Sequence, residues 1–368
     1  VYTPTDYTVS YDGFVSGEDE SVLSDTLSFE GTALTATNSG TYVITPRGLT
    51  SSNYSITYVS GVLSITQRDM SEVIVGGISD RVYNGLAQTL SPTATFNSLT
   101  LIEGTDYTTS FTGNTNVGTA SVTLTGIGNF NGEKTVGFNI TSKTLTITAD
   151  DQSKVYDSAV YTPTDYTVSY DGFVDGEDKN VLTGTLTYTG TALTATASGT
   201  YVITPDGFTS SNYSITYVSG VLSITQKPIT IAITDLSKVY GDSDPSLAHT
   251  ISTGSVYGQT PTGSLTRTLG EEVGTYTISK GNLTYGSNYI ETFINGELTI
   301  TARTITVTAA AKTKVFGAED PELTFTATPA VGAPVVAGSA ATVTFTGTLT
   351  RTAGENAGTY SITLGTLS

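Results

Sequence analysis

The chain has 368 residues, no cysteine, no tryptophan, one histidine and a formal charge of −18 at pH 7. Disulfides, cysteine nucleophiles and thiolate metal sites are therefore impossible, and one chain cannot form a metal site that needs several histidines. The acidic balance opposes nucleic acid and anionic lipid surfaces as partners, because no basic stripe exists to displace counterions from phosphates. No stretch reaches the 18 consecutive apolar residues of a membrane helix, so we expect no membrane insertion. The composition indicates a non-catalytic, extended protein.

Internal similarity organises the chain. Residues 1–67 align without a gap with residues 160–226, and 56 of the 67 positions are identical. A near-copy of this length predicts that the chain consists of repeated small domains, and not of two or three unrelated ones.

Four short motifs recur in the same order along the whole chain. A basic residue, valine and an aromatic residue occur together at residues 81–83, 154–156, 238–240 and 314–316. Glycine-threonine before an apparent strand begins at Gly40, Gly118, Gly199, Gly274 and Gly358. Asparagine followed by an aromatic residue begins at Asn53, Asn129, Asn212 and Asn288. Isoleucine-threonine-x-(lysine or arginine) spans residues 65–68, 140–143, 224–227 and 300–303.

The motifs divide the chain into five repeats, which we number in chain order: residues 1–67, 68–141, 142–226, 227–301 and 302–368. The first repeat has no counterpart of the opening strand of the third. The fifth stops where the fourth continues into its closing strand. Because both end repeats are incomplete, we expect similar repeats on either side of this segment.

Each repeat has the pattern of short β-strands. Threonine, which is unusually common in this chain, alternates with valine, isoleucine and tyrosine in runs of period two between glycine-rich turns. In residues 145–148, 229–234 and 305–308 one face is aliphatic and the other mostly hydroxyl, as expected for strands buried on one side. Tyr213, Ile215 and Tyr217 likewise share one face of a strand near the end of the third repeat.

Helical structure is expected only as single turns. One turn is plausible within residues 176–182. Another is plausible at residues 245–249, where Asp244 would cap a helix that begins at Pro245.

We therefore predict a mainly β fold, a tandem array of small antiparallel β-domains with five or six strands in each. A reduced immunoglobulin-like sandwich, which we favour, and a β-grasp-like sheet with a vestigial helix both fit, because 67–85 residues are few for a seven-stranded immunoglobulin domain. Only about three residues connect consecutive repeats, and no glycine-serine tether is present. Five such domains in line would form an elongated, semi-rigid rod on the order of 170 Å long.

The fourth repeat resembles the MBG repeat domains (YGX type) of large bacterial surface adhesins at residues 238–245, Lys-Val-Tyr-Gly-Asp-Ser-Asp-Pro. The fifth repeat shows the same resemblance at residues 316–321 and 354–360. The first and third repeats resemble the related YDG type, although Ser158 stands where that type usually has glycine. The second repeat, with the motif Tyr83-Asn84-Gly85, resembles a variant found in bacterial cell-wall repeat proteins.

The resemblance assigns a domain type to each segment. The assignments are a YDG-like repeat lacking its first strand at 1–67, a cell-wall-type β repeat at 68–141, a YDG-like repeat at 142–226, an MBG repeat at 227–301 and an MBG repeat lacking its last strand at 302–368. It implies a secreted protein at the bacterial cell surface with a stalk or adhesive role. It transfers no catalytic residue and no cofactor.

One acidic loop is a candidate metal site. Asp171, Asp175, Glu177 and Asp178 place four carboxylates within eight residues, and calcium favours clustered carboxylate oxygens. The copy of this loop in the first repeat has Ser16 at the position of Asp175, and aspartate-glycine pairs are ordinary turn residues. We expect turn or capping duty for these residues, with calcium binding as the alternative.

Other conspicuous residues have structural interpretations. Most of the 22 tyrosines lie in alternating strands and are expected in the core, whereas Tyr257 and Tyr285 lie in predicted loops and are candidates for an adhesive patch. His249 has no partner motif for catalysis, and Met70 is expected to fill space between repeats. The pairs Arg267/Glu271 and Arg351/Glu355 are expected to brace the turn before the Gly-Thr-Tyr strand.

Two functions remain open at this point. The first is a non-catalytic stalk or spacer of a repetitive bacterial surface adhesin, whose partners are the neighbouring repeats and which projects a terminal binding domain from the cell. The second is an adhesive module that recognises host glycan or protein through the loop tyrosines and acidic loops.

Overall fold

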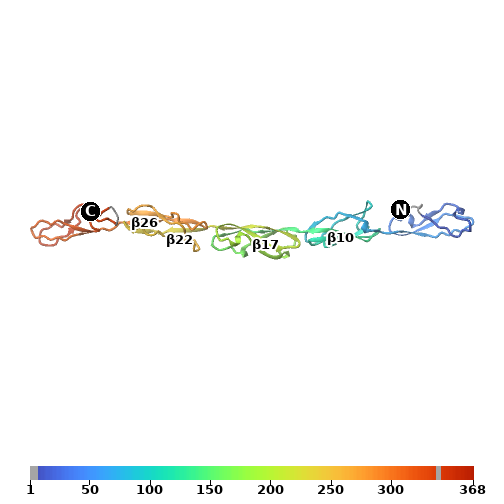
Figure 1. Ribbon diagram of the computed structural model, residues 1–368, viewed down its shortest axis with the longest axis horizontal. Helices are drawn as coiled ribbons and strands as arrows, with labels where there is room; N and C mark the ends of the chain where they lie inside the picture. The colour runs from blue at the N-terminus through green and yellow to red at the C-terminus, as the bar shows by residue number, and fades with distance from the viewer. Residues whose placement is uncertain (1–6, 337–340) are drawn as a thin grey trace. The chain divides into compact units, whose positions relative to one another are not determined.

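The computed structural model describes residues 7–336 and 341–368; the first six residues of the first repeat and residues 337–340 of the fifth lie outside this description. The described chain consists of short strands and loops, with helical structure limited to single 3₁₀ turns (Figure 1). It divides into two compact units. The first unit contains Val1–Ala149, Thr167–Tyr188 and Thr204–Ser219, and the second contains Asp150–Tyr166, Thr189–Ile203 and Gly220–Ser368.

The fourth repeat, which lies wholly in the second compact unit, has seven strands. They are β20 (Lys227–Ile233), β21 (Leu236–Val239), β22 (His249–Thr253), β23 (Thr266–Arg267), β24 (Gly274–Ser279), β25 (Tyr289–Ile294) and β26 (Gly296–Thr301). The strand orders of its two sheets are β22-β20-β25 and β21-β26-β24-β23. Its core is built from both sheets, since Ile233 of the first sheet packs with Ile278, Leu298 and Ile300 of the second. The repeat is therefore a two-layer sandwich.

The third repeat has the same seven strands in the same order. They are β13 (Lys143–Ala149), β14 (Gln152–Val155), β15 (Val168–Asp171), β16 (Thr183–Thr189), β17 (Gly199–Thr209), β18 (Tyr213–Val218) and β19 (Gly220–Thr225). The sheet orders, β15-β13-β18 and β14-β19-β17-β16, match those of the fourth repeat strand for strand. Three 3₁₀ turns interrupt the loops: η5 (Pro163–Asp165), η6 (Lys179–Val181) and η7 (Thr191–Thr194).

The second repeat keeps this plan with a modified opening. Its elements are β4 (Arg68–Asp69), η4 (Met70–Glu72), β5 (Ile74–Gly76), β6 (Arg81–Val82), β7 (Thr93–Phe96), β8 (Leu99–Thr100), β9 (Tyr107–Thr112), β10 (Gly118–Gly126), β11 (Phe130–Asn131) and β12 (Glu133–Thr141). The sheet β6-β12-β10-β9 corresponds to the four-stranded sheet of the other complete repeats, and β5-β7-β8 and β11-β4 complete the layer opposite. Met70 is fully buried in the core of this repeat beside Val73, Val122 and Leu124. The prediction that it fills space between repeats is therefore wrong.

The end repeats carry fewer strands. The first has β1 (Ser28–Glu30), β2 (Gly40–Arg47) and β3 (Gly61–Ile65) in one sheet, together with the turns η2 (Glu20–Val22) and η3 (Thr32–Thr35). The fifth has two strand pairs, β27 (Thr306–Ala309) with β28 (Phe325–Thr328) and β29 (Thr350–Arg351) with β30 (Ile362–Thr363).

The structure confirms a mainly β array and decides for the sandwich, and it corrects two details of the prediction. The complete third and fourth repeats have seven strands each, where five or six were expected. Their sheets are also mixed and not purely antiparallel, because β13 pairs parallel with β18, β14 with β19, β20 with β25 and β21 with β26. Period-two alternation shows which face of a strand is buried, but it contains no information about the direction of the neighbouring strand.

An aspartate marks the point where the chain crosses from one sheet to the other. Asp151, between β13 and β14, accepts a hydrogen bond from the backbone N–H of Val221 at 2.8 Å. Asp235, between β20 and β21, accepts one from the N–H of Glu297 at 2.9 Å. Each carboxylate thus satisfies a backbone donor at the start of the last strand, and this contact fixes the opening segment against the closing one.

The two predicted helical turns had different outcomes. Asp178 caps the turn η6 by accepting a hydrogen bond from the N–H of Asn180 at 2.8 Å, so the first prediction is confirmed as a 3₁₀ turn. The second is wrong, because His249 begins strand β22 and residues 243–248 form no helix. Asp244 is engaged in ion pairs with Lys238 and Arg267, and its carboxylate does not serve as a helix cap.

Candidate functional site

The contacts between consecutive repeats, which we call junctions, bring together all four motifs of the sequence. The first and second junctions, between repeats 1 and 2 and between repeats 2 and 3, lie in the first compact unit. The third and fourth junctions lie in the second compact unit. Covalent connections are short: a single residue separates β12 from β13, and a single residue separates β19 from β20. The junction is therefore determined by side chains and not by a flexible linker.

At each of the first three junctions, the asparagine of the asparagine-aromatic motif connects the two repeats. Its side-chain Oδ1 accepts a hydrogen bond from a backbone N–H of the preceding repeat, directly before the glycine-threonine motif. The three pairs are Ser39 N–H to Asn129 at 2.7 Å, Val117 N–H to Asn212 at 3.1 Å, and Ser198 N–H to Asn288 at 2.8 Å. The same geometry in three places shows that the asparagine motif and the glycine-threonine motif are two halves of one contact.

Further polar groups surround this asparagine. At the first junction Asn129 Nδ2 donates to Asn38 Oδ1 at 3.0 Å, and at the second Asn212 Nδ2 donates to Asn116 Oδ1 at 3.2 Å. At the third junction Ser198 Oγ lies 3.1 Å from Asn288 Oδ1. The glutamine that ends a repeat adds one more bond, as Gln226 Nε2 donates to the carbonyl of Ser287 at 2.7 Å.

An aromatic pair forms the apolar part of the junction. Tyr83, from the basic-valine-aromatic motif, packs edge-on against Tyr213 of the next repeat, with centroids 5.5 Å apart at 81°. Tyr156 packs in the same way against Tyr289, at 5.4 Å and 82°. Both leading rings are buried, whereas Phe316, the corresponding residue of the fifth repeat, is 73% exposed. The aromatic residue of the basic-valine-aromatic motif, which we call the aromatic knob, is therefore buried where the next repeat supplies an asparagine-aromatic strand.

The second junction also has a continuous hydrophobic core. Tyr83, Phe138 and Ile140 of the second repeat belong to one buried cluster with Leu145 and Ile147 of the third. Because side chains of both repeats share this cluster, exposing the junction would expose apolar surface, which opposes independent rotation of the two domains.

The predicted acidic loop is part of the second junction. The two carboxylate oxygens of Glu177 accept hydrogen bonds from the hydroxyls of Tyr83, at 2.5 Å, and of Tyr213. Burial, followed by this bond to Glu177, raises the pKa of Tyr213 to about 12, and the bond to Glu177 raises the pKa of Tyr83. In the first repeat, Glu18 accepts the corresponding bond from Tyr54. Glu177 thus holds together one tyrosine of each repeat.

The remaining calcium candidates do not converge with Glu177. Asp178 caps η6, Asp171 ends strand β15, and Asp175 lies exposed in the turn between them. Within residues 7–336 and 341–368, no group of three or more histidine, cysteine, aspartate or glutamate side chains is placed to hold a metal ion. The turn and capping roles predicted for this loop are seen directly at Asp178.

Basic residues at the start of a repeat contact aromatic rings or carbonyls nearby. The Lys227 ammonium lies 5.2 Å from the ring centre of Tyr257, and the Arg68 guanidinium lies 5.0 Å from that of Phe96. At the fourth junction Arg303 Nε donates to the carbonyl of Tyr240 at 2.8 Å. Lys227 and Arg68 thus contact rings of their own repeats, and at the fourth junction the basic residue of the last motif bonds to the preceding repeat.

The fourth and fifth repeats each contain a charge quartet, a group of two basic and two acidic side chains. The first quartet is Lys238, Asp244, Arg267 and Glu271, and the second is Lys314, Asp320, Arg351 and Glu355. The predicted Arg/Glu pairs are confirmed, at 2.5 and 2.6 Å, but the lysine and aspartate that complete each group were not predicted from the sequence. Arg351 and Lys314 lower the pKa of Asp320 to about 2. The lysine-x₅-aspartate spacing common to both repeats was the available signal.

The loop tyrosines lie in structural contacts. Tyr257 is 37% exposed and packs edge-on against Tyr156 of the preceding repeat, with centroids 5.9 Å apart. Tyr285 is half-buried, and its hydroxyl is 3.1 Å from Nε2 of His249. His249 therefore has a structural partner, and Tyr257 belongs to the third junction.

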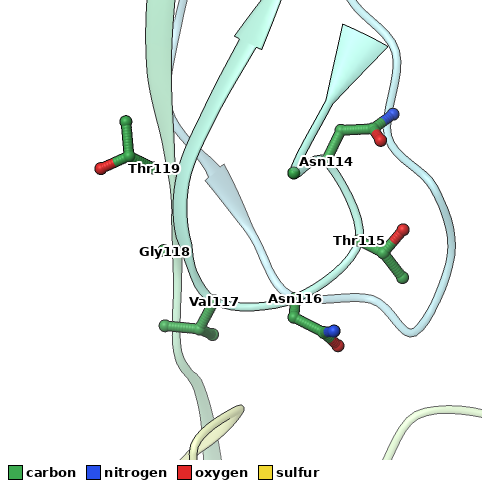
Figure 2. A pocket seen from close by; sticks show the side chains of 7 residues that line it. Asn114, Thr115, Asn116, Val117, Gly118 and Thr119 are labelled. Atoms are coloured by element: carbon green, nitrogen blue, oxygen red, sulfur yellow. The ribbon is translucent and has the colours of Figure 1, made fainter.

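Two hollows on the described surface differ in the residues that line them. One of about 420 Å³ is lined by residues 113–119, which are the loop between β9 and β10 and the first two residues of β10. In Figure 2 the side chains of Asn114, Thr115, Asn116, Val117 and Thr119 radiate outward from this loop and do not point toward a common centre. A second hollow of about 720 Å³ in the fifth repeat lies between residues 312–316 and 358–362, where the fourth repeat has β26 between β21 and β24. Its lining includes the second charge quartet, whose four side chains are paired with one another. Specific small-molecule sites place polar groups toward one point, and the loop of Figure 2 does not.

The described residues contain no helix that is long and apolar enough to span a membrane. A search of the curated proteins finds no match to the chain. The sequence profile of the MBG domain (YGX type) matches residues 2–64, 145–223, 229–299 and 305–368. These four segments correspond to the first, third, fourth and fifth repeats, so the profile also matches the two repeats that resembled the YDG type. MBG repeats are typical of extracellular surface proteins. With most of its length matched in four places, the chain belongs to the MBG domain family (YGX type) and contains tandem copies of that domain.

Proposed function

We propose that this chain is a non-catalytic spacer of a repetitive bacterial surface adhesin, and that it holds a binding domain of that protein away from the cell. The observation that carries the proposal is the threefold recurrence of the asparagine contact at Ser39–Asn129, Val117–Asn212 and Ser198–Asn288. A contact that recurs between neighbouring repeats serves to orient one domain on the next.

The electrostatics of the chain agree with this role. A net charge of −18 opposes collapse of the chain on itself and association with other acidic surfaces. Stability in such an array is approximately the sum of each repeat and its contacts with its neighbours. The junctions therefore determine both how stable the array is and how stiff it is.

Small-angle X-ray scattering of the full chain tests the proposal. We expect a maximum dimension on the order of 170 Å, from five repeats of roughly 35 Å each. Replacing Asn129, Asn212 and Asn288 by alanine should loosen the junctions and broaden the distribution of distances. The matched control is Asn53→Ala, because Asn53 is the same motif residue in the first repeat and its Oδ1 lies 3.4 Å from Ser52 Oγ of its own repeat.

Two outcomes would contradict the spacer role. A compact particle of a few tens of ångströms would exclude an extended array. Saturable binding of the full chain to a glycan array or to host-cell proteins, lost in variants of Tyr257, would favour the adhesive module instead.

A further inference from the structure

The first and last strands of the fourth repeat run side by side in one direction. β20 pairs parallel with β25, from Lys227 opposite Tyr289 to Ala232 opposite Ile294. β21 pairs parallel with β26, from Leu236 opposite Leu298 to Val239 opposite Thr301. The separation of the partners along the chain is the same in both pairings. Residues 227–239 and 289–301 therefore keep one register although both segments change from one sheet to the other midway.

Backbone hydrogen bonds extend this ladder at both ends. The N–H of Lys227 donates to the carbonyl of Asn288 at 2.9 Å, and the N–H of Tyr240 donates to the carbonyl of Thr301 at 2.8 Å. The third repeat has the same two parallel pairings, β13 with β18 and β14 with β19, and there too both pairings share one separation along the chain. The arrangement is therefore common to the third and fourth repeats, whereas the parallel pairings of the second repeat, β4 with β11 and β6 with β12, do not share one separation.

The ladder is shielded from water on its inner face. Ile229, Ile231 and Ile233 of β20 are at most 6% exposed, and Leu298 and Ile300 of β26 are at most 1% exposed. Water that competes for backbone hydrogen bonds can reach the ladder only from the outer face, so the bonds are protected until the strands move.

The direction of the strands decides how the repeat responds to tension. The chain enters the fourth repeat at Lys227 and leaves it at Thr301, and parallel pairing places these two points at opposite ends of the ladder. Tension between them acts along the strands, so the ladder bonds must fail together. Had the chain entered and left at the same end, the bonds would open one after another, each contributing only about 1 kcal/mol.

We propose that the third and the fourth repeat are each a shear clamp, in which the parallel ladder between the opening and closing segments resists tension transmitted along the chain. This function goes beyond spacing, since a spacer under no load would need no such pairing. It depends on the proposed function only for the source of the tension. Forced unfolding is governed by the unfolding rate, and here that rate is set by the simultaneous loss of the ladder.

Single-molecule force spectroscopy on the full chain tests the clamp, and the absence of cysteine allows handles at chosen positions. The shear pair is Gln226→Cys with Ala302→Cys, which loads the ladder from opposite ends. The zipper pair is Gln226→Cys with Ile290→Cys, which loads the same ladder from one end. All three positions are exposed, and Gln226 is altered in both variants. The shear pair encloses the whole fourth repeat, so its unfolding should lengthen the tether by on the order of 250 Å.

We expect the shear pair to unfold at a force at least twofold higher than the zipper pair at the same pulling speed. Equal forces for the two directions would overturn the clamp. Denaturant unfolding of both variants verifies that their equilibrium stabilities are alike. Should either variant fail to fold, the third repeat provides a second comparison, Ser142→Cys with Gln226→Cys against Ser142→Cys with Ser214→Cys. Because scattering measures extension and this experiment measures resistance, failure of the clamp is distinguishable from failure of the spacer role.

Discussion

Truncation of Tyr156 to alanine would remove the aromatic knob of the third junction. The ring is 3% exposed, and it packs edge-on against Tyr289 and Tyr257 of the next repeat. Phe316 occupies the same motif position in the fifth repeat and is 73% exposed. Substituting each of these two residues therefore compares the aromatic knob where an asparagine-aromatic strand packs on it with the same motif position where none does.

The burial difference sets the expected magnitudes. Removing a buried aromatic side chain costs about 3–5 kcal/mol, of which the edge-on pairs account for about 0.5–1.5 kcal/mol each. Removing an exposed ring should change stability by no more than about 0.5 kcal/mol. For domains of this size about 4–8 °C of melting temperature corresponds to 1 kcal/mol, so Tyr156→Ala should lower the affected transition by roughly 12 °C or more.

Calorimetry of the full chain, with hydrogen exchange to locate the change, measures this effect. Tyr156→Ala should accelerate exchange in β14, β19 and β25 and leave the second repeat unchanged, whereas Phe316→Ala should leave the whole profile near that of the unaltered chain. Tyr156→Phe keeps the ring and should retain most of the stability. Equal effects of Tyr156→Ala and Phe316→Ala would refute the inference that the knob stabilises the junction.

Four further predictions concern the pH dependence of the fifth repeat, the core, the ionisation of tyrosine and metal binding. Asp320 has a lowered pKa, so its stabilising contribution is complete above the unfolded pKa near 4 and is lost as the pH falls toward about 2; the melting temperature of the fifth repeat should fall over this range, and Asp320→Asn should flatten that dependence. Leu298→Ala should cost about 2–5 kcal/mol in denaturant unfolding, whereas Ile290→Ala on the exposed face should cost little, and equal losses would contradict the assignment of the core. Glu177→Gln removes the charge beside Tyr213, so the absorbance of ionised tyrosine should develop at lower pH than in the unaltered chain. Added calcium should leave the thermal midpoint unchanged if the acidic loop serves the junction, and an upward shift would restore the metal interpretation.

The sequence by itself was sufficient for the tandem repetition of small β-domains and for the buried faces. Alternation of threonine with valine, isoleucine and tyrosine correctly indicated that Tyr213 and its neighbours two and four residues on face inward, because side-chain direction in a strand depends only on the parity of the position. The recurring motifs could also be identified from the sequence, since their spacing along the chain can be read without the fold. The sequence did not show that the motifs meet at the junctions.

Only the tertiary structure shows that motifs far apart in the sequence contact one another at the junctions. Asn212 and Val117 are 95 residues apart, and Lys238 and Glu271 are 33 apart, yet both pairs are in direct contact. A single sequence shows which residues are able to form such contacts but not which of them form a contact with each other. The type of a side chain determines which bonds it can make, whereas only the fold determines which residues lie close to it. The same reason explains why the predictions of a space-filling role between repeats for Met70 and of a helix cap at Asp244 are wrong.

Strand direction was decided by the tertiary structure alone. β20 and β25 have the sequence pattern of half-buried strands, and that pattern is the same for parallel and antiparallel partners. Whether tension shears or peels a repeat depends on that direction, so the property on which mechanical resistance rests has no signature in any short stretch of sequence. The parallel direction arises because the opening and closing segments, which lie at opposite ends of the repeat's sequence, pair in the same register in both sheets.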